Sequence, residues 1–117
     1  MRTSLRGLSG LVVLAAGLLG LSQLAGLWHA KALGQRVAQA EPGDIVMYTT
    51  TDCPYCAQAR QWFGEYDVLY TECNTSVDAD CRAAFDRLAA PGVPTLVVKG
   101  QRQVGFQPDR VAQALER

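Results

Sequence analysis

The sequence has 117 residues, with 11 basic and 11 acidic side chains, which is enough chain for one small domain. Four of the basic residues and none of the acidic ones precede residue 41, so the rest of the chain has seven basic and eleven acidic side chains, a net charge of −4. An acidic body of this kind lacks the basic stripe that neutralises phosphates, which argues against a nucleic acid as partner.

The amino-terminal segment is apolar and long enough to span a membrane. Residues 7–28 form a run of 22 residues without a charge, and Arg2 and Arg6 precede it. About 20 apolar residues cross a bilayer core of about 30 Å, and basic residues before such a run favour an amino terminus in the cytosol. We therefore expect residues 1–28 to be a signal anchor or a signal peptide, and the domain to lie outside the cytosol.

The sequence leaves open whether this segment is removed. Ala38-Gln39-Ala40 has the small-residue pattern of a signal-peptidase site, which predicts a periplasmic or secreted protein released near Ala40. The apolar run is longer than the ~7–15 residues typical of signal peptides, which instead predicts an inner-membrane anchor with the domain facing the periplasm. Residues 29–43 are rich in alanine and lack apolar spacing, so we expect a linker there and a domain over residues 44–117.

The first half of the domain predicts two strands joined by a helix. The apolar, partly β-branched run Ile45–Thr49 is typical of a buried strand. Pro54 is favoured at the first position of a helix, and the apolar residues that follow at helical spacing predict a helix to about Gly64. Residues 68–71 are the expected second strand.

The second half predicts a helix, a hairpin and a final helix. Turn and cap residues, among them Thr75, come before a helix whose apolar face is spaced i, i+4, i+7, i+8 and i+11, namely Val77, Cys81, Ala84, Phe85 and Leu88. Thr95–Val98 and residues 103–104 are strands joined by a tight turn at Lys99-Gly100, and Pro108 opens the last helix. The order β-α-β-α-β-β-α predicts an α/β fold with a mixed four-stranded sheet and three helices, preceded by the hydrophobic helix.

Cys53 and Cys56 form a C-x-x-C motif between the first strand and its helix, which is the context of a redox pair. A free thiol with a pKa near 8.5 is only about 3% thiolate at pH 7, whereas the N–H groups and dipole at a helix amino terminus favour the anion. We therefore expect Cys53 to be the attacking sulfur and Cys56, one turn deeper, to resolve the mixed disulfide.

Two other interpretations of this pair stay open. One is an inert disulfide, and the other is a metal site. A zinc site needs a second close pair, whereas Cys73 and Cys81 are separated by seven residues. Copper binding by Cys53 and Cys56 alone remains an alternative, because soft thiolates suit Cu(I).

From about Asp44 to its end, the chain resembles the glutaredoxin family. The segment IVMYTTTDCPYCAQAR is similar to the family's strand-to-helix segment with its CPYC dithiol. Gly92-Val93-Pro94-Thr95 is similar to its second landmark, a loop with a cis proline that lies against the active-site cysteines. The resemblance implies a thioredoxin-like fold and a glutaredoxin-like thiol-disulfide oxidoreductase.

The same resemblance implies a substrate groove. In it the backbone of Val93, beside Pro94, would pair with a bound peptide or glutathione, and Tyr55 would line the groove. The amides of Gly105 and Phe106 precede a predicted helix, where they could hold a carboxylate. These five residues are the expected substrate-binding set.

Three departures from the family pattern leave open whether glutathione is the natural partner. Many glutaredoxins have a lysine three residues before the first cysteine, where this chain has Thr50, and Asp52 adds negative charge beside the nucleophile. The segment of residues 104–109 has one glycine and a proline, and it resembles the corresponding segment of redoxins that serve ribonucleotide reductase.

Cys73 and Cys81 are not explained by the resemblance. Outside the cytosol they could form a structural disulfide, which a chain-entropy model values at roughly 2 to 3 kcal/mol for a loop of this length. The alternative is a buried free thiol, because Cys81 is on the apolar face of its helix.

We therefore expect a monomeric thiol-disulfide oxidoreductase that exchanges disulfides with protein thiols or glutathione outside the cytosol. It would need no metal or organic cofactor, and glutathione is a candidate reductant or substrate. The alternative is a membrane-tethered module that binds copper or, as the resemblance allows, an iron-sulfur cluster through the same cysteines.

Overall fold

The computed structural model describes residues 4–117, so the expected contribution of Arg2 to membrane orientation lies outside the described residues. The chain divides into two compact units, one ending at Ala32 and the other spanning Leu33–Arg117.

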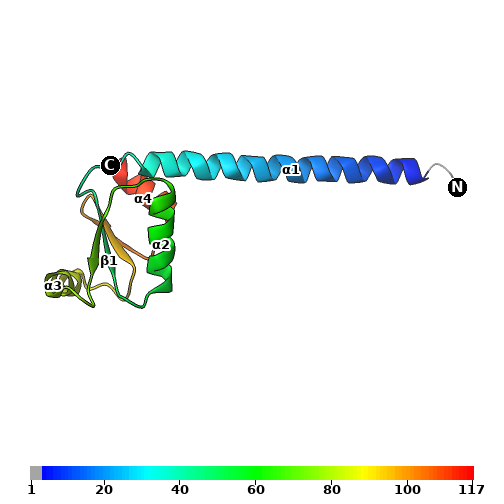
Figure 1. Ribbon diagram of the computed structural model, residues 1–117. Coiled ribbons are helices and arrows are strands. Elements are labelled where there is room, and N and C mark those ends of the chain that lie inside the picture. The colour runs from blue at the N-terminus through cyan, green and yellow to red at the C-terminus, as the bar shows by residue number, and fades with distance from the viewer. Residues whose placement is uncertain (1–3) are drawn as a thin grey trace. The chain divides into compact units, whose positions relative to one another are not determined.

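The first unit consists of most of helix α1, which runs from Ser4 to Val37 (Figure 1). The large apolar side chains between Leu8 and Trp28 are all more than half exposed to solvent. By length and composition, this helix could cross a membrane. The expected long hydrophobic helix is therefore confirmed, and it continues beyond Trp28, where the sequence analysis placed the end of the membrane segment.

The second unit contains a four-stranded mixed sheet in the order β2-β1-β3-β4. Strands β1 and β2 are parallel, β3 is antiparallel to β1, and β4 is antiparallel to β3; their bounds are Ile45–Thr49, Thr71–Asn74, Thr95–Val98 and Gln101–Val104. Lys99 and Gly100 connect β3 to β4 with positive φ angles of 46° and 80°, as a two-residue hairpin of the type I′ class requires. The predicted mixed sheet and its hairpin are confirmed.

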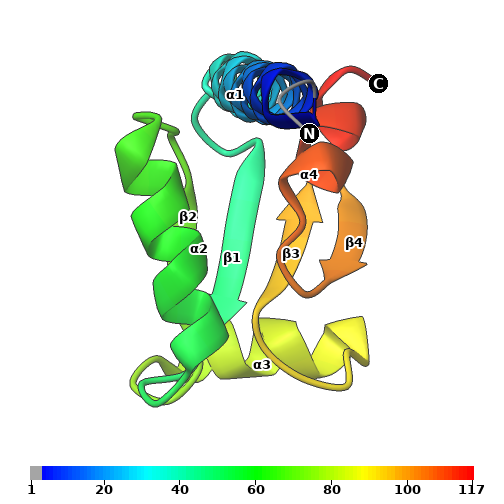
Figure 2. The same ribbon diagram turned by 90° about the vertical axis from the view of Figure 1, so that its right-hand side faces the viewer.

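Three helices complete the unit: α2 (Pro54–Glu65), α3 (Ala79–Leu88) and α4 (Pro108–Leu115). Figure 1 shows α2 and α4 on one side of the strands and α3 on the other, and Figure 2 shows the strands side by side behind α2 and α4. The core lies under α2 and α4, where buried side chains of both helices meet those of β1 and β3. Its largest members are Phe63, Ile45, Met47, Leu96, Val37, Val98 and Val111.

The second strand lies three residues later than predicted. Val68 is buried, but its burial comes from packing under α2, where its N–H donates to the carbonyl of Phe63 at 2.9 Å and closes the helix end. Parallel pairing with β1 starts only at Thr71, opposite Val46. An apolar residue that covers a helix end was therefore mistaken for the start of a strand.

Helix α3 also begins later than predicted. The side chain of Asp78 accepts hydrogen bonds from the N–H groups of Asp80 and Cys81 at 2.9 and 3.0 Å, so Asp78 is the N-cap. Val77 precedes the cap and is 77% exposed, so it does not belong to the apolar face of the helix. Thr75, expected to contribute to the cap, instead bonds to the end of β1.

The expected linker over residues 29–43 differs most from the structure. The last turn of α1 and the residues that follow it belong to the compact unit, because Val37 and Ala40 are fully or almost fully buried in its core. A Cβ atom at Gly34 would overlap the ring of Tyr66, so the absence of a side chain there permits the contact. Alanine-rich composition concealed an apolar spacing of i, i+4 and i+7 along this segment, formed by Leu33, Val37 and Ala40.

We predict that Val37→Ala lowers the free energy of unfolding by about 1–3 kcal/mol, because it removes two buried methyl groups from a packed core. The matched control is Val77→Ala, the same change at an exposed valine, and it should alter stability by less than about 0.5 kcal/mol. Urea unfolding of the detergent-solubilised chain, followed by tryptophan fluorescence, measures both. Equal stabilities of the two variants would mean that the segment before residue 41 is a linker after all.

Candidate active site

Cys53 is the N-cap of α2, four residues after the end of β1. Its extended backbone, with φ −138° and ψ 99°, turns the chain out of the strand, and Pro54 starts the helix at a position where a missing N–H costs nothing. The amide of Cys56 donates a hydrogen bond to the sulfur of Cys53 at 3.1 Å. A helix start therefore holds the first sulfur of the motif, as the spacing predicts.

The two sulfurs are joined in a disulfide, with Cα atoms 5.2 Å apart. Cys56 is fully buried, whereas Cys53 is partly exposed. An external thiol or disulfide can therefore reach the pair only from the side of Cys53. This asymmetry is the geometry that the sequence analysis expected of an attacking and a resolving cysteine.

The cation that lines a hollow beside Cys53 is held in an ion pair. Arg60, which lines a hollow beside Cys53, is bound to Glu72 of β2 at 2.6 Å, and the same carboxylate accepts the hydroxyl of Thr49 at 3.0 Å. Burial, reinforced by the charge of Glu72 and opposed by that of Arg60, raises the pKa of Tyr70 above its usual value. Asp52 is exposed and directly precedes Cys53 in the chain.

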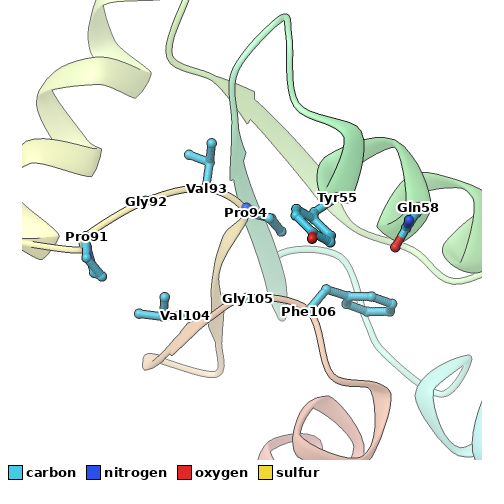
Figure 3. Close-up of a pocket in the computed structure, with 9 residues that line it drawn as sticks. All are labelled: Tyr55, Gln58, Pro91, Gly92, Val93, Pro94, Val104, Gly105 and Phe106. Carbon is cyan, nitrogen blue, oxygen red and sulfur yellow. The ribbon is translucent and has the colours of Figure 1, made fainter.

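A groove of about 280 Å³ lies beside the motif (Figure 3). It is lined by residues from three segments: the first turns of α2, the loop before β3, and the end of β4 with the turn after it. The lining residues are Tyr55, Gln58, Pro91, Gly92, Val93, Pro94, Val104, Gly105 and Phe106. All five residues of the expected substrate-binding set are among them, and the roles of Tyr55, Val93, Pro94 and Phe106 stay predictions.

The loop before β3 presents free backbone groups to this groove. The Val93–Pro94 peptide bond is cis, as the resemblance implied. The described residues offer no hydrogen-bond partner to either the N–H or the carbonyl of Val93, and β3 begins only at Thr95. An extended peptide could therefore pair with Val93 by adding a short strand.

The turn after β4 is built differently from the sequence expectation. Gly105 has a φ of 78°, and its N–H donates to the carbonyl of Pro94 at 2.8 Å, so this amide is not free to hold a carboxylate. The ring of Phe106 packs edge-on against those of Trp62 and Phe63, with centroids 5.5 and 5.1 Å away. Gly105 therefore fastens the turn to the cis-proline loop, and Phe106 forms a wall of the groove.

Sequence reasoning missed four lining residues: Gln58, Pro91, Gly92 and Val104. Gln58 could have been found, because it lies one turn after Tyr55 on the same helix face. Val104 reaches the groove through the pairing of Thr95 with Val104, which joins segments nine residues apart. That strand register is set by the folded sheet, so no local pattern in the sequence shows that Val104 lies at the groove.

Cys73 and Cys81 also form a disulfide, between β2 and the first turn of α3, with Cα atoms 5.3 Å apart. All four cysteines are therefore paired within residues 4–117. In the same part of the chain, no group of three or more histidine, cysteine, aspartate or glutamate side chains is placed to hold a metal ion.

Comparisons with known proteins agree with this geometry. A family model named Glutaredoxin matches residues 45–103. The solved structure of the thioredoxin-like protein BC3987 is 30% identical, with a TM-score of 0.53 over 60% of this chain and 97% of that one. No match was found among curated proteins.

Two glutaredoxin structures share the fold at lower identity. A glutaredoxin from Archaeoglobus fulgidus is 12% identical, with a TM-score of 0.51 over 63% of this chain and 87% of that one. A mutated buckwheat glutaredoxin is 17% identical, with a TM-score of 0.50 over 77% of this chain and 90% of that one. The expected thioredoxin-like fold is confirmed.

Proposed function

The chain belongs to the glutaredoxin family, and on that premise we propose that it exchanges disulfides with extracytosolic protein substrates through Cys53 and Cys56. The family and the fold make it a thiol-disulfide oxidoreductase. The observation that carries the proposal is the asymmetry of the pair, because one sulfur is partly exposed at a helix start and the other is buried one turn behind it.

The proposed reaction starts from the reduced pair. The thiolate of Cys53, favoured by the Cys56 amide and the helix dipole, attacks one sulfur of the substrate disulfide. That S–S bond breaks, the leaving sulfur takes up a proton, and a mixed disulfide forms on Cys53. The deprotonated sulfur of Cys56 then attacks Cys53 and releases the second substrate thiol, which is also protonated.

Each reaction cycle transfers two electrons and two protons from the cysteine pair to the substrate disulfide. The substrate disulfide gains them and becomes two thiols, while Cys53 and Cys56 become the disulfide seen in the structure. A second thiol compound must then reduce this disulfide before another turnover, and glutathione is a candidate for that role. The reaction as proposed uses the sulfur atoms of the chain and needs no metal or organic cofactor.

The groove favours a peptide segment over glutathione as substrate. Glutathione has two carboxylates, yet none of the nine described residues that line the groove is cationic, and Thr50 stands where many family members have lysine. A peptide needs no cation, because it can pair with the free N–H and carbonyl of Val93 while its side chains contact Tyr55 and Phe106. We therefore infer that protein disulfides are the natural substrates.

The membrane location is inferred from the apolar helix α1 and from the core contacts of the residues that follow it. Cleavage after Ala40 would remove Val37 and Ala40 from the core to which they belong. Retention of the segment keeps that core complete and leaves α1 as an uncleaved anchor, with Arg6 before its apolar run on the cytosolic side. We infer an inner-membrane protein whose domain faces the periplasm.

The roles of the two cysteines are tested by Cys53→Ser and Cys56→Ser. Cys53→Ser should abolish reduction of a protein disulfide, because it removes the exposed sulfur of the pair and leaves the buried Cys56 thiol out of reach of the substrate. Cys56→Ser should accumulate a mixed disulfide with the substrate, since nothing resolves it. Mass spectrometry of acid-quenched reactions measures the adduct, and circular dichroism confirms folding. Adduct formation by folded Cys53→Ser would contradict the assignment.

Substrate preference is tested by Thr50→Lys. One added cation three residues before Cys53 should raise kcat/KM for a glutathione mixed disulfide by about two- to fivefold and leave reduction of a neutral protein disulfide unchanged. Thr71→Lys, at the opposite end of β2 from the site, is the matched control. If the wild-type chain already prefers the glutathione substrate to the protein one, the peptide assignment is wrong.

Location is tested in cells that express the full chain. We expect a membrane-bound protein of 12.6 kDa that resists alkaline carbonate and is released by detergent. Protease added to spheroplasts should digest its domain. A soluble periplasmic form that begins at Glu41 would refute the uncleaved anchor, and protection from the protease would refute the orientation.

A further inference from the structure

The loop between β2 and α3 lies against the segment that leads to Cys53. Residues 75–78, called here the β2–α3 loop, follow the last residue of β2 and precede α3. Thr49 and Asn74 are paired at the ends of the parallel strands β1 and β2, so the loops that follow both strands start at the same edge. None of its residues lines the groove, and nothing in the proposed reaction uses them.

Thr75 fixes one end of this contact. Its N–H and its hydroxyl both donate to the carbonyl of Thr49, at 2.8 and 3.0 Å. Both threonines are buried, so these hydrogen bonds are shielded from water. The last residue of β1 is thereby held in place as the chain leaves the sheet.

Ser76 fixes the next step. Its hydroxyl oxygen accepts the N–H of Thr51 at 3.2 Å, and Thr51 is two residues before Cys53. The N–H of Ser76 donates to the side-chain oxygen of Asn74 at 2.9 Å, which sets the direction of the loop. Ser76 is therefore the described side chain that holds the backbone between β1 and the N-cap of α2.

The Cys73–Cys81 disulfide closes this loop at its base. Cys73 is in β2 and Cys81 is in the first turn of α3, eight positions later, so the bond joins the two sides of the loop. The side chain of Asp78 accepts a hydrogen bond from the N–H of Cys81, so the end of the loop is also linked to the first turn of α3. The loop that bonds to Thr49 and Thr51 is thus short and covalently closed.

We propose that Ser76 is a positioning residue for Cys53, and that the Cys73–Cys81 disulfide supports catalysis by holding the β2–α3 loop that carries Ser76. The inference rests on the function proposed above and adds a role for the second cysteine pair. The bond between Cys73 and Cys81 neither forms nor breaks during turnover. It keeps the N-cap in the geometry in which the Cys56 amide points at the sulfur of Cys53.

Ser76→Ala is the first test, because Ser76 is exposed and its loss should disturb folding little. It removes the acceptor for Thr51, and we expect kcat/KM for a protein disulfide to fall about three- to tenfold. The pH at which alkylation of reduced Cys53 is half-maximal should rise, since the thiolate loses its aligned donor. Ser76→Thr keeps the hydroxyl and should restore both values.

Thr71→Ala is the matched control, since it removes an exposed hydroxyl from the far end of β2 that has no side-chain hydrogen bond in the described structure. It should leave the rate and the alkylation profile unchanged. Ser76→Ala that behaves like Thr71→Ala overturns the proposal. Loss of rate with an unchanged alkylation profile also overturns it, because that would place Ser76 in substrate contact.

The role of the disulfide is tested with Cys73→Ala combined with Cys81→Ala. The double variant should lose at least as much rate as Ser76→Ala, and adding Ser76→Ala to it should cost less than Ser76→Ala costs in the wild type. If the two losses of rate are fully additive, or if the double variant keeps full activity, the disulfide does not support catalysis through Ser76. Circular dichroism verifies folding, and if the double variant unfolds, the same comparison is made with Cys73→Ser combined with Cys81→Ala, which leaves no free thiol and places the polar side chain at the partly exposed position. A wild-type chain without exchange activity would instead refute the proposed function itself.

Discussion

The start of helix α2 is the constraint on which the site depends. The Cys56 amide points at the Cys53 sulfur at 3.1 Å only because the chain leaves β1, turns at an extended N-cap and enters a helix at Pro54. That arrangement keeps one sulfur partly exposed, buries the other, and aims a donor at the anion that must form during exchange. The disulfide chemistry follows from this one local geometry.

Three neighbouring segments meet near that helix start. The cis-proline loop before β3 and the turn at Gly105 are bonded to each other, and together with Tyr55 they form the groove. The β2–α3 loop is hydrogen-bonded to the backbone of Thr49 and Thr51, in the segment that leads to the motif. The groove offers backbone groups and apolar walls to a substrate, while the loop holds the nucleophile in place.

Electrostatics separate this site from the glutathione-binding pattern that the resemblance implied. Arg60 is the cation closest along the chain to Cys53, and it is committed to Glu72. With Thr50 in place of lysine and Asp52 beside the nucleophile, the thiolate depends on helix N–H groups instead of cationic side chains. A site of this kind suits substrates recognised through their backbone, which is why the groove argues for peptides.

The amino-acid sequence alone is enough to predict the local features: the redox motif at a helix start, the proline loop, the tight hairpin and the order of strands and helices. Each depends on residues adjacent in the chain, whose spacing and backbone preferences are visible in the letters. The tertiary structure decided which apolar residues are buried. Val37 packs in the core, Val68 covers a helix end and Val77 is exposed, although all three are valines in apolar or alternating surroundings. It also decided that Val104 reaches the groove and Ser76 reaches Thr51, because strand register and parallel pairing join segments that no local pattern connects.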